Sequence, residues 1–189
     1  MIMQMSGEHQ LDPRRIFAAG FSNGGIFAHY LGSQLAGRLA AIAPVSGGLA
    51  EPVLHHFKPS APISVCMIHG AADTVVPYNG GDVDVRDNGR IIATTQCANL
   101  WTQQVGSFAA PMSSLLSDTT PNEHRRVTYT RWPHAKKGGA EVVLYTIENG
   151  GHGWPTEPQL SLMQSIWHVS HSFDATKAIW EFFKKHPKT

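Results

Sequence analysis

The sequence predicts one α/β domain in which helices flank a mainly parallel sheet. Segments of strand length alternate along the chain with segments whose apolar residues recur at helical spacing. Several strand-like segments are apolar almost throughout, which is typical of strands buried on both faces of a parallel sheet. A length of 189 residues is enough for a single domain with a sizeable core, residues 1–189 being treated as one unit.

The first elements surround a short glycine-rich turn. Residues 1–10 look like the end of a helix, and Asp12-Pro13 is a turn signal. Residues 15–21 are expected to form a strand, and residues 23–37 a helix that ends with Gly37 as C-cap. The apolar stripe expected on this helix and just beyond it consists of Ile26, Phe27, Tyr30, Leu31, Leu35 and Leu39.

Two further apolar runs predict buried strands, at residues 39–45 and 62–68, with a loop or short helix at 49–60 between them. Cys66 lies within the second run and is expected to be a small core residue rather than the disulfide partner of Cys97.

The second half of the chain is expected to contain fewer strands and more loop. The predicted elements are a loop at 74–90, a helix at 91–105 with Trp101 on its apolar side, a surface excursion at 106–124, alternating strands at 127–132 and 141–147 around a turn at 137–139, a polar loop to about 170, and an amphipathic helix at 172–185.

Composition excludes several classes of function. The chain is 42% hydrophobic and carries a formal net charge of +1, so nothing favours nucleic acid or an anionic membrane as partner. No apolar run reaches membrane-spanning length, and residues 1–5 are too short for a signal peptide. His168 and His171 have metal-ligand spacing but no evident third ligand, so we expect no metal site there.

The strongest local motif is Gly20-Phe21-Ser22-Asn23-Gly24, a G-x-S-x-G sequence between a predicted strand and a predicted helix. Such a turn holds the serine in a strained conformation and pushes its hydroxyl out of the sheet edge. Gly20 and Gly24 are expected to let strand and helix pass close together. The Asn23 N–H, at the helix N-terminus, is predicted to be a donor to an oxyanion.

Three predicted strands end in a residue of potential catalytic use: Ser22, Asp73 and His152. The carboxyl ends of parallel strands lie at one edge of a sheet, so we expect these residues to meet. Ser22 would be a nucleophile, His152 its base, and Asp73 the group that orients the imidazole. Each has a plainer interpretation: Asp73 as a loop cap, and His152 as a loop histidine bonded to backbone.

Three aromatic residues near the predicted strand ends are candidates for an acyl pocket: Tyr78, Trp132 and Trp154. Aromatic residues pack in cores more often than they line pockets, so this assignment competes with a structural one.

Three motifs together resemble the polyhydroxybutyrate depolymerase and feruloyl esterase group of α/β-hydrolases. They are Gly-Phe-Ser-Asn-Gly-Gly at 20–25, His-Gly-Ala-Ala-Asp-Thr-Val-Val-Pro-Tyr-Asn-Gly-Gly at 69–81 and Gly-Gly-His-Gly-Trp-Pro at 150–155, with a similar lead-in at 11–16. The resemblance implies a serine esterase with Ser22, Asp73 and His152 as triad and no cofactor. It further implies esters of short hydroxyalkanoates, hydroxycinnamates or acetylated sugars as substrates, and it favours secretion.

The chain departs from this group in one respect. Members carry several strands before the nucleophile turn, including the loop with the second oxyanion donor, whereas this sequence begins just before the turn. Residues 16–21 should therefore form an apolar edge strand, so either the chain is a fragment or another chain covers that edge. We expect a homo-oligomer formed through it. The alternative is that residues 1–10 fold back over that edge.

The sequence therefore favours a small serine carboxylesterase with a reduced α/β-hydrolase fold. A second interpretation is a catalytically weak remnant that binds or assembles. A third is a peptidase or thioesterase acting through the same three residues.

Overall fold

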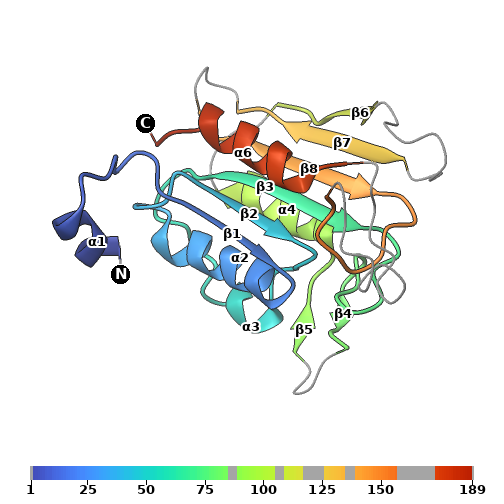
Figure 1. Ribbon diagram of the computed structural model, residues 1–189. Coiled ribbons are helices and arrows are strands. Elements are labelled where there is room, and N and C mark those ends of the chain that lie inside the picture. Colours follow the sequence, from blue (N-terminus) through green and yellow to red (C-terminus); the bar gives the residue numbers. More distant parts are fainter. Residues whose placement is uncertain are drawn as a thin grey trace.

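The computed structural model describes residues 2–84, 89–104, 109–116, 126–134, 139–156 and 173–188. Its main feature is a six-stranded sheet in the order β1-β2-β3-β8-β7-β6 (Figure 1). The strands are β1 (Phe17–Phe21), β2 (Ala41–Val45), β3 (Ser64–Gly70), β6 (Met112–Leu116), β7 (Val127–Trp132) and β8 (Val142–Ile147).

Strands β1, β2, β3 and β8 are parallel neighbours, whereas β7 runs antiparallel to β8 and β6 antiparallel to β7. Every residue of β2 and β3 is buried, as their continuous apolar sequences predict. The mainly parallel sheet expected from the sequence is confirmed, and β1 lies at one edge of it.

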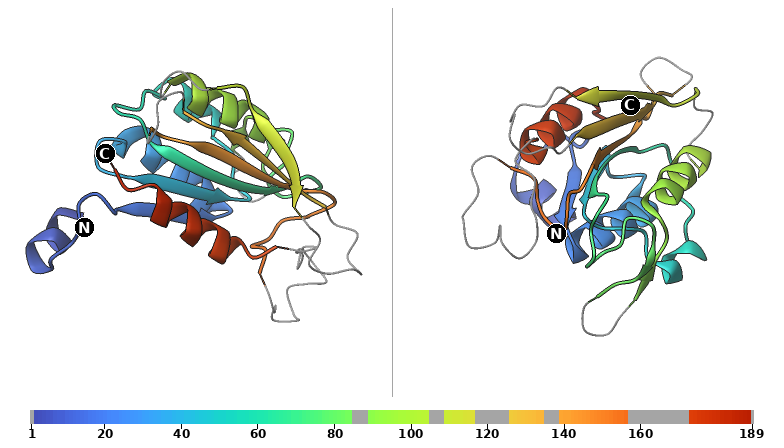
Figure 2. Two further views of the ribbon diagram at one scale, coloured as in Figure 1. Left: turned by 90° about the horizontal axis from the view of Figure 1, so that it is seen from above. Right: turned by 90° about the vertical axis from the view of Figure 1, so that its right-hand side faces the viewer.

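Helices cover both faces of the sheet (Figure 2). The helices are α2 (Asn23–Leu35), α3 (Glu51–Leu54) and α4 (Thr94–Gln104) on one face, and α6 (Ala175–Lys185) on the other. The core under α4 includes Ile42, Met67 and the fully buried Trp101. The core under α6 joins Ile68 and Val143 to Ile179 and Phe183.

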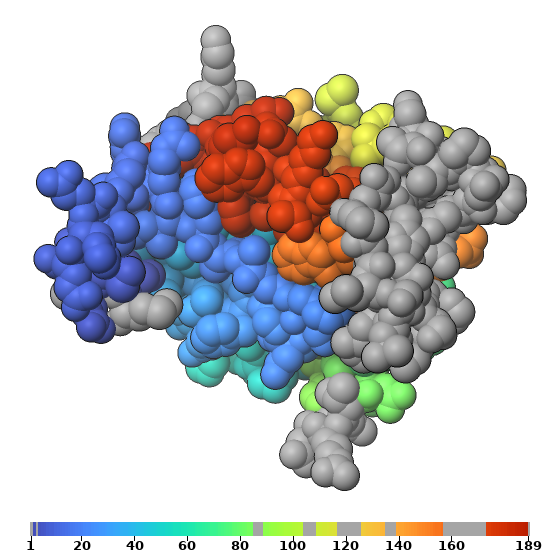
Figure 3. All heavy atoms as spheres, viewed as in Figure 1, coloured from blue at the N-terminus to red at the C-terminus, as the bar shows by residue number. Residues whose placement is uncertain are grey.

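Helix α1 (Ile2–Glu8) stands away from β1 in the views of Figures 1 and 2, and its side chains from Gln4 to Glu8 are exposed. It does not fold back over the β1 edge. In Figure 3 the side chains of α6, in red, and those of α2, in blue, lie on either side of that edge. Within the described ranges, no helix is long and apolar enough to cross a membrane.

Helix α2 differs from its predicted packing at two of the six stripe positions; the other four are buried or pack against the core: Ile26, Leu31, Leu35 and Leu39. Phe27 and Tyr30 are 55% and 43% exposed, although the helical spacing predicted a buried stripe. Small or polar residues face inward instead, because the helix lies so close to its neighbours that a Cβ on Gly32 would be 2.7 Å from Ile42 Cδ1. The helix ends at Leu35 with Ala36 as C-cap, so Gly37 is not the cap.

Two strand pairs were not predicted. Strand β6 lies inside the expected surface excursion, and β4 (Gly81–Asp82) pairs with β5 (Arg90–Ile91) across the expected loop. Cys66 and Cys97 are both free and buried, in agreement with a core role for Cys66. Most of the excursion, the centre of the 137–139 turn, the polar loop, His168 and His171 lie outside the described residues.

Candidate active site

Ser22 is the residue between β1 and α2. Its backbone has φ 56° and ψ −119°, a conformation that L-residues adopt only under constraint. The constraint comes from hydrogen bonds: the Ser22 N–H donates to the Val45 carbonyl at 2.9 Å, and the Ser22 carbonyl accepts from Gly25 and Ile26. The turn is therefore fixed from both sides, and the serine side chain stays half-exposed.

The glycines of the turn differ in how much space surrounds them. A Cβ on Gly20 would lie 2.1 Å from the Gly24 carbonyl oxygen, so only glycine fits there. A Cβ on Gly24 would meet nothing within 4 Å, which corrects the expectation that both glycines are needed for close approach. The second close approach involves Gly25 and Gly47, since a Cβ on Gly47 would lie 2.7 Å from Gly25 Cα.

Asp73 follows β3 and is buried. Its Oδ1 accepts the backbone N–H groups of Val75 and Val76, each at 2.9 Å, so the carboxylate does cap its own loop. Its Oδ2 is turned the other way and lies 2.9 Å from His152 Nδ1. Burial by itself raises the pKa of Asp73, but the hydrogen bonds from His152, His69 and Val76 outweigh it and hold that pKa well below its ordinary value.

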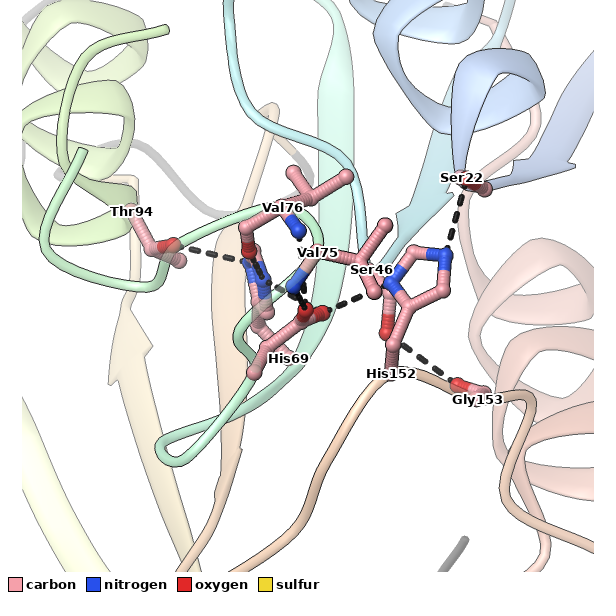
Figure 4. Close-up of polar contacts among 9 residues, drawn as sticks. Ser22, Ser46, His69, Val75, Val76, Thr94, His152 and Gly153 are labelled. Atoms are coloured by element: carbon pink, nitrogen blue, oxygen red, sulfur yellow. Dashed lines mark hydrogen bonds and ion pairs between the residues drawn. The ribbon is translucent and has the colours of Figure 1, made fainter. Parts of the chain in front are cut away.

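His152 follows β8 and lies between the other two residues (Figure 4). Its Nε2 is 2.9 Å from Ser22 Oγ, and its Nδ1 faces Asp73. Because an ionised carboxylate only accepts hydrogen bonds, Nδ1 carries the proton and Nε2 is left to accept one from the serine hydroxyl. The sequence order therefore brings Ser22, Asp73 and His152 into one hydrogen-bonded chain.

Residues outside the predicted set hold the His152 loop in place. The Ser46 hydroxyl donates to the Gly153 carbonyl at 3.1 Å (Figure 4), and the Phe21 ring packs 4.9 Å from the His152 ring. A Cβ on Gly70 would lie 2.3 Å from the Gly150 carbonyl oxygen, so β3 and this loop touch backbone to backbone. Ser46, with φ 45°, is signalled in the sequence only by its Ser-Gly-Gly position at the end of a strand.

Asn23 opens α2 and is exposed beside Ser22. Its N–H belongs to the first helical turn, where backbone donors have no partner within the helix. An oxyanion formed at Ser22 would be next to this N–H and to the positive end of the helix dipole.

The three aromatic candidates do not share one location. Trp132 ends β7, pairs with Val142 at the start of β8, and packs in the α4-side core, so it lies at the opposite end of β8 from His152. Because β7 is antiparallel, its carboxyl end is at the wrong edge, and the assignment of Trp132 to the pocket is wrong.

Tyr78 and Trp154 lie nearer the site, but their polar atoms are already bonded to the protein. The Tyr78 hydroxyl is 2.9 Å from Thr146 Oγ1, and its ring stands edge-on to His69. The Trp154 indole N–H donates to Thr176 of α6. Across the described part of the chain, no group of three His, Cys, Asp or Glu side chains is arranged to hold a metal ion.

A phospholipase/carboxylesterase family model matches residues 2–84. The chain is 34% identical over 172 residues to feruloyl esterase B of Piromyces equi, a match that covers 85% of this chain and 30% of that protein. It is 37% identical over 168 residues to the bifunctional acetylxylan esterase/xylanase XynS20E of Neocallimastix patriciarum, covering 88% and 22% of the two chains.

The chain has the α/β-hydrolase fold and is similar in sequence to a feruloyl esterase and an acetylxylan esterase. The crystal structure of a thermostable esterase superimposes with a TM-score of 0.55 at 15% identity, covering 99% of this chain and 35% of that one, which supports the α/β-hydrolase fold. The chain thus spans about a third or less of the length of these relatives.

Proposed function

We propose that this α/β-hydrolase is a serine carboxylic ester hydrolase in which Ser22, His152 and Asp73 act as the catalytic triad. The observation that supports this most directly is the pair of 2.9 Å contacts from the two His152 ring nitrogens, one to Ser22 Oγ and one to Asp73 Oδ2. A serine hydroxyl is a weak nucleophile until a base removes its proton, and this geometry supplies the base with a fixed tautomer.

In the first half of the reaction, Ser22 Oγ attacks the ester carbonyl carbon while its proton passes to His152 Nε2. The carbonyl oxygen becomes an oxyanion, which accepts the Asn23 N–H. The carbon–oxygen bond to the alcohol then breaks, and His152 returns the proton to the departing alkoxide. Asp73 stays ionised throughout and stabilises the imidazolium, which its low pKa permits.

In the second half, water attacks the acyl group on Ser22 and loses its proton to His152. The second tetrahedral intermediate collapses by breaking the bond between the acyl carbon and Ser22 Oγ. The serine oxygen regains the proton from His152, and the carboxylic acid leaves. Every step uses the same three side chains and needs no added group.

The substrates we propose are short-chain, hydroxyalkanoate or hydroxycinnamoyl esters. Support for the hydroxycinnamoyl class comes from the relative named feruloyl esterase B, and an acetyl ester is suggested by the relative named acetylxylan esterase. The test is hydrolysis of a chromogenic acetyl ester, a feruloyl ester and acetylated xylan, with thioester and amide analogues beside them. Faster turnover of amide or thioester would favour the peptidase or thioesterase alternative.

We further propose that the chain associates with a second copy through β1. The strand is at an edge of the sheet formed by the described residues, and α1 does not cover it. An uncovered edge presents backbone N–H and C=O groups that another strand can pair with.

If Asn23 is the one oxyanion donor present, the rate of ester hydrolysis would be lower by roughly 10²–10³ than with two donors. A catalytically weak remnant is the alternative that this rate would favour.

A further inference from the structure

Asp73 contacts a second histidine. His69, on β3, is 1% exposed, and its Nε2 lies 3.3 Å from Asp73 Oδ2, the same oxygen that faces His152. The same Nε2 lies 2.9 Å from the Val76 carbonyl oxygen (Figure 4). On the other side of the ring, Nδ1 lies 2.9 Å from the hydroxyl of Thr94, the first residue of α4.

These contacts determine where the His69 proton is. A carbonyl oxygen only accepts hydrogen bonds, so the Nε2 beside Val76 must carry a hydrogen. In the neutral ring Nδ1 is then an acceptor, and the Thr94 hydroxyl donates to it. The Val76 carbonyl therefore selects the tautomer in which the His69 Nε2–H points toward Val76 and Asp73, and the Thr94 hydroxyl supports it by donating to Nδ1.

The Asp73 carboxylate consequently has four donors. Oδ1 accepts from Val75 and Val76, Oδ2 accepts from His152, and the Nε2–H of His69 faces Oδ2 from 3.3 Å. An ionised carboxylate offers about four lone-pair sites, so the group is fully occupied and its plane is fixed. Without His69, Oδ2 would keep a single donor in a buried site, and the carboxylate could rotate away from His152.

We propose that His69 is a positioning residue for the hydrolase reaction: together with Thr94 it holds the Asp73 carboxylate in the orientation that directs His152 toward Ser22. This inference rests on the proposed function. His69 touches neither Ser22 nor an incoming ester, and it acts through Asp73. The titratable groups around the His69 ring are Asp73, Tyr78 and His29. Tyr78 packs edge-on at 5.6 Å, and the pKa of His29 is lowered first by burial and then by the nearby His69.

The first test compares turnover by two pairs of variants. His69→Leu removes the N–H, whereas His69→Gln places an amide N–H at a similar reach. Thr94→Val removes the hydroxyl at nearly constant shape, and Thr94→Ser keeps it. Losing a hydrogen bond to a charged group predicts a kcat lower by roughly 10- to 100-fold in His69→Leu with KM little changed. We expect His69→Gln and Thr94→Ser to keep a kcat close to that of the wild type. The kcat of Thr94→Val should lie between those of the wild type and His69→Leu.

The second test does not depend on turnover. In the wild-type protein the His152 Nδ1 proton is held by Asp73 and should give a slowly exchanging downfield NMR resonance. We expect that resonance to persist in His69→Gln and to weaken or vanish in His69→Leu, with thermal unfolding measured on each variant to exclude loss of fold. Thr94→Val serves as the milder variant if His69→Leu does not fold.

The two proposals fail in different ways. A wild-type protein that shows the resonance but hydrolyses none of the esters would refute the proposed function, and the variants would still test His69. A His69→Leu protein that keeps both the resonance and its kcat, in an active wild-type background, overturns the positioning role. Equal loss in His69→Leu and His69→Gln would overturn it as well, because the N–H would then not be the cause.

Discussion

His152 Nε2 lies 2.9 Å from Ser22 Oγ although 130 positions separate the two residues in the chain. The contact arises because β1 and β8 are parallel members of one sheet, so the turns after both strands lie at one edge. The rest of the site follows from this arrangement. Asp73 comes from β3, which pairs with β8 and lies between it and the β1–β2 pair.

Replacing Asp73 with Asn should leave the fold intact and nearly abolish ester hydrolysis. The amide keeps the size of the side chain, but it can donate to His152 and so favours the wrong tautomer. In a well-studied serine protease triad the same exchange lowers kcat by about 10⁴, and we expect a loss of that order here. Steady-state kinetics on the chromogenic ester measures it. A loss below about tenfold would be inconsistent with Asp73 as the triad acid.

Two glycine exchanges in the nucleophile turn should have opposite outcomes. In Gly20→Ala the new Cβ would be 2.1 Å from the Gly24 carbonyl oxygen, so the turn must open. Overpacking of this kind costs about 1–3 kcal/mol or more of the free energy of unfolding, and activity should fall with it. Gly24→Ala is the matched control: its Cβ meets nothing within 4 Å, and alanine favours a helix. Chemical denaturation measures the free energy of unfolding of both variants. Similar losses of stability in the two would contradict the close approach of Gly20 to Gly24.

Stability should fall in mild acid because of His29. This residue is buried, its Nδ1 accepts the Trp101 indole N–H at 3.0 Å, and burial lowers its pKa to about 3 despite an opposing hydrogen bond to Gly47. Between pH 6.5 and about 3 the unfolded chain binds a proton that the folded chain does not, so the free energy of unfolding decreases as pH falls through this window.

The variant His29→Gln should lose that part of the pH dependence, whereas His55→Gln, at an exposed histidine, should keep it. Urea unfolding at several pH values from 7 to 4 gives the comparison. If wild type and His29→Gln show parallel curves, His29 is not the group that titrates.

Association through β1 can be tested with a single charge. Ala19 is the exposed residue of β1, and a lysine there should oppose strand pairing in the way that natural edge strands do. We expect the wild-type chain to be a dimer or larger by light scattering and Ala19→Lys to be smaller. Ser6→Lys, on the exposed surface of α1, is the control. A wild-type monomer at high concentration would refute the proposed association.

Strands β2 and β3 could be predicted because they are buried on both faces and so read as continuous apolar runs. Ser22 was predicted from its motif, Asp73 from its position after such a run, and His152 from its position after a strand predicted by alternation. The predicted stripe of helix α2 was wrong at Phe27 and Tyr30, because contact as close as that at Gly32 places small residues where large ones were expected.

The antiparallel half of the sheet was harder to predict from the sequence. Strand β6, Met-Ser-Ser-Leu-Leu, has no alternation, and all five of its residues are exposed, so only its pairing with β7 identifies it as a strand. Trp132 was misplaced because strand direction is a property of the whole sheet. His69 was visible as a strand-end histidine, but its contact with Asp73 depends on a reverse turn that sequence spacing does not specify.

Ser22 is the proposed nucleophile, and covalent labelling tests this role most directly. A serine-directed phosphonate should modify the wild-type chain once, with the added mass on the peptide that contains Ser22, and hydrolysis of the chromogenic ester should cease as labelling proceeds. Ser22→Ala should take up no label and show no hydrolysis while unfolding at the wild-type temperature. Labelling of Ser46 or another serine, or hydrolysis retained by Ser22→Ala, would contradict the account.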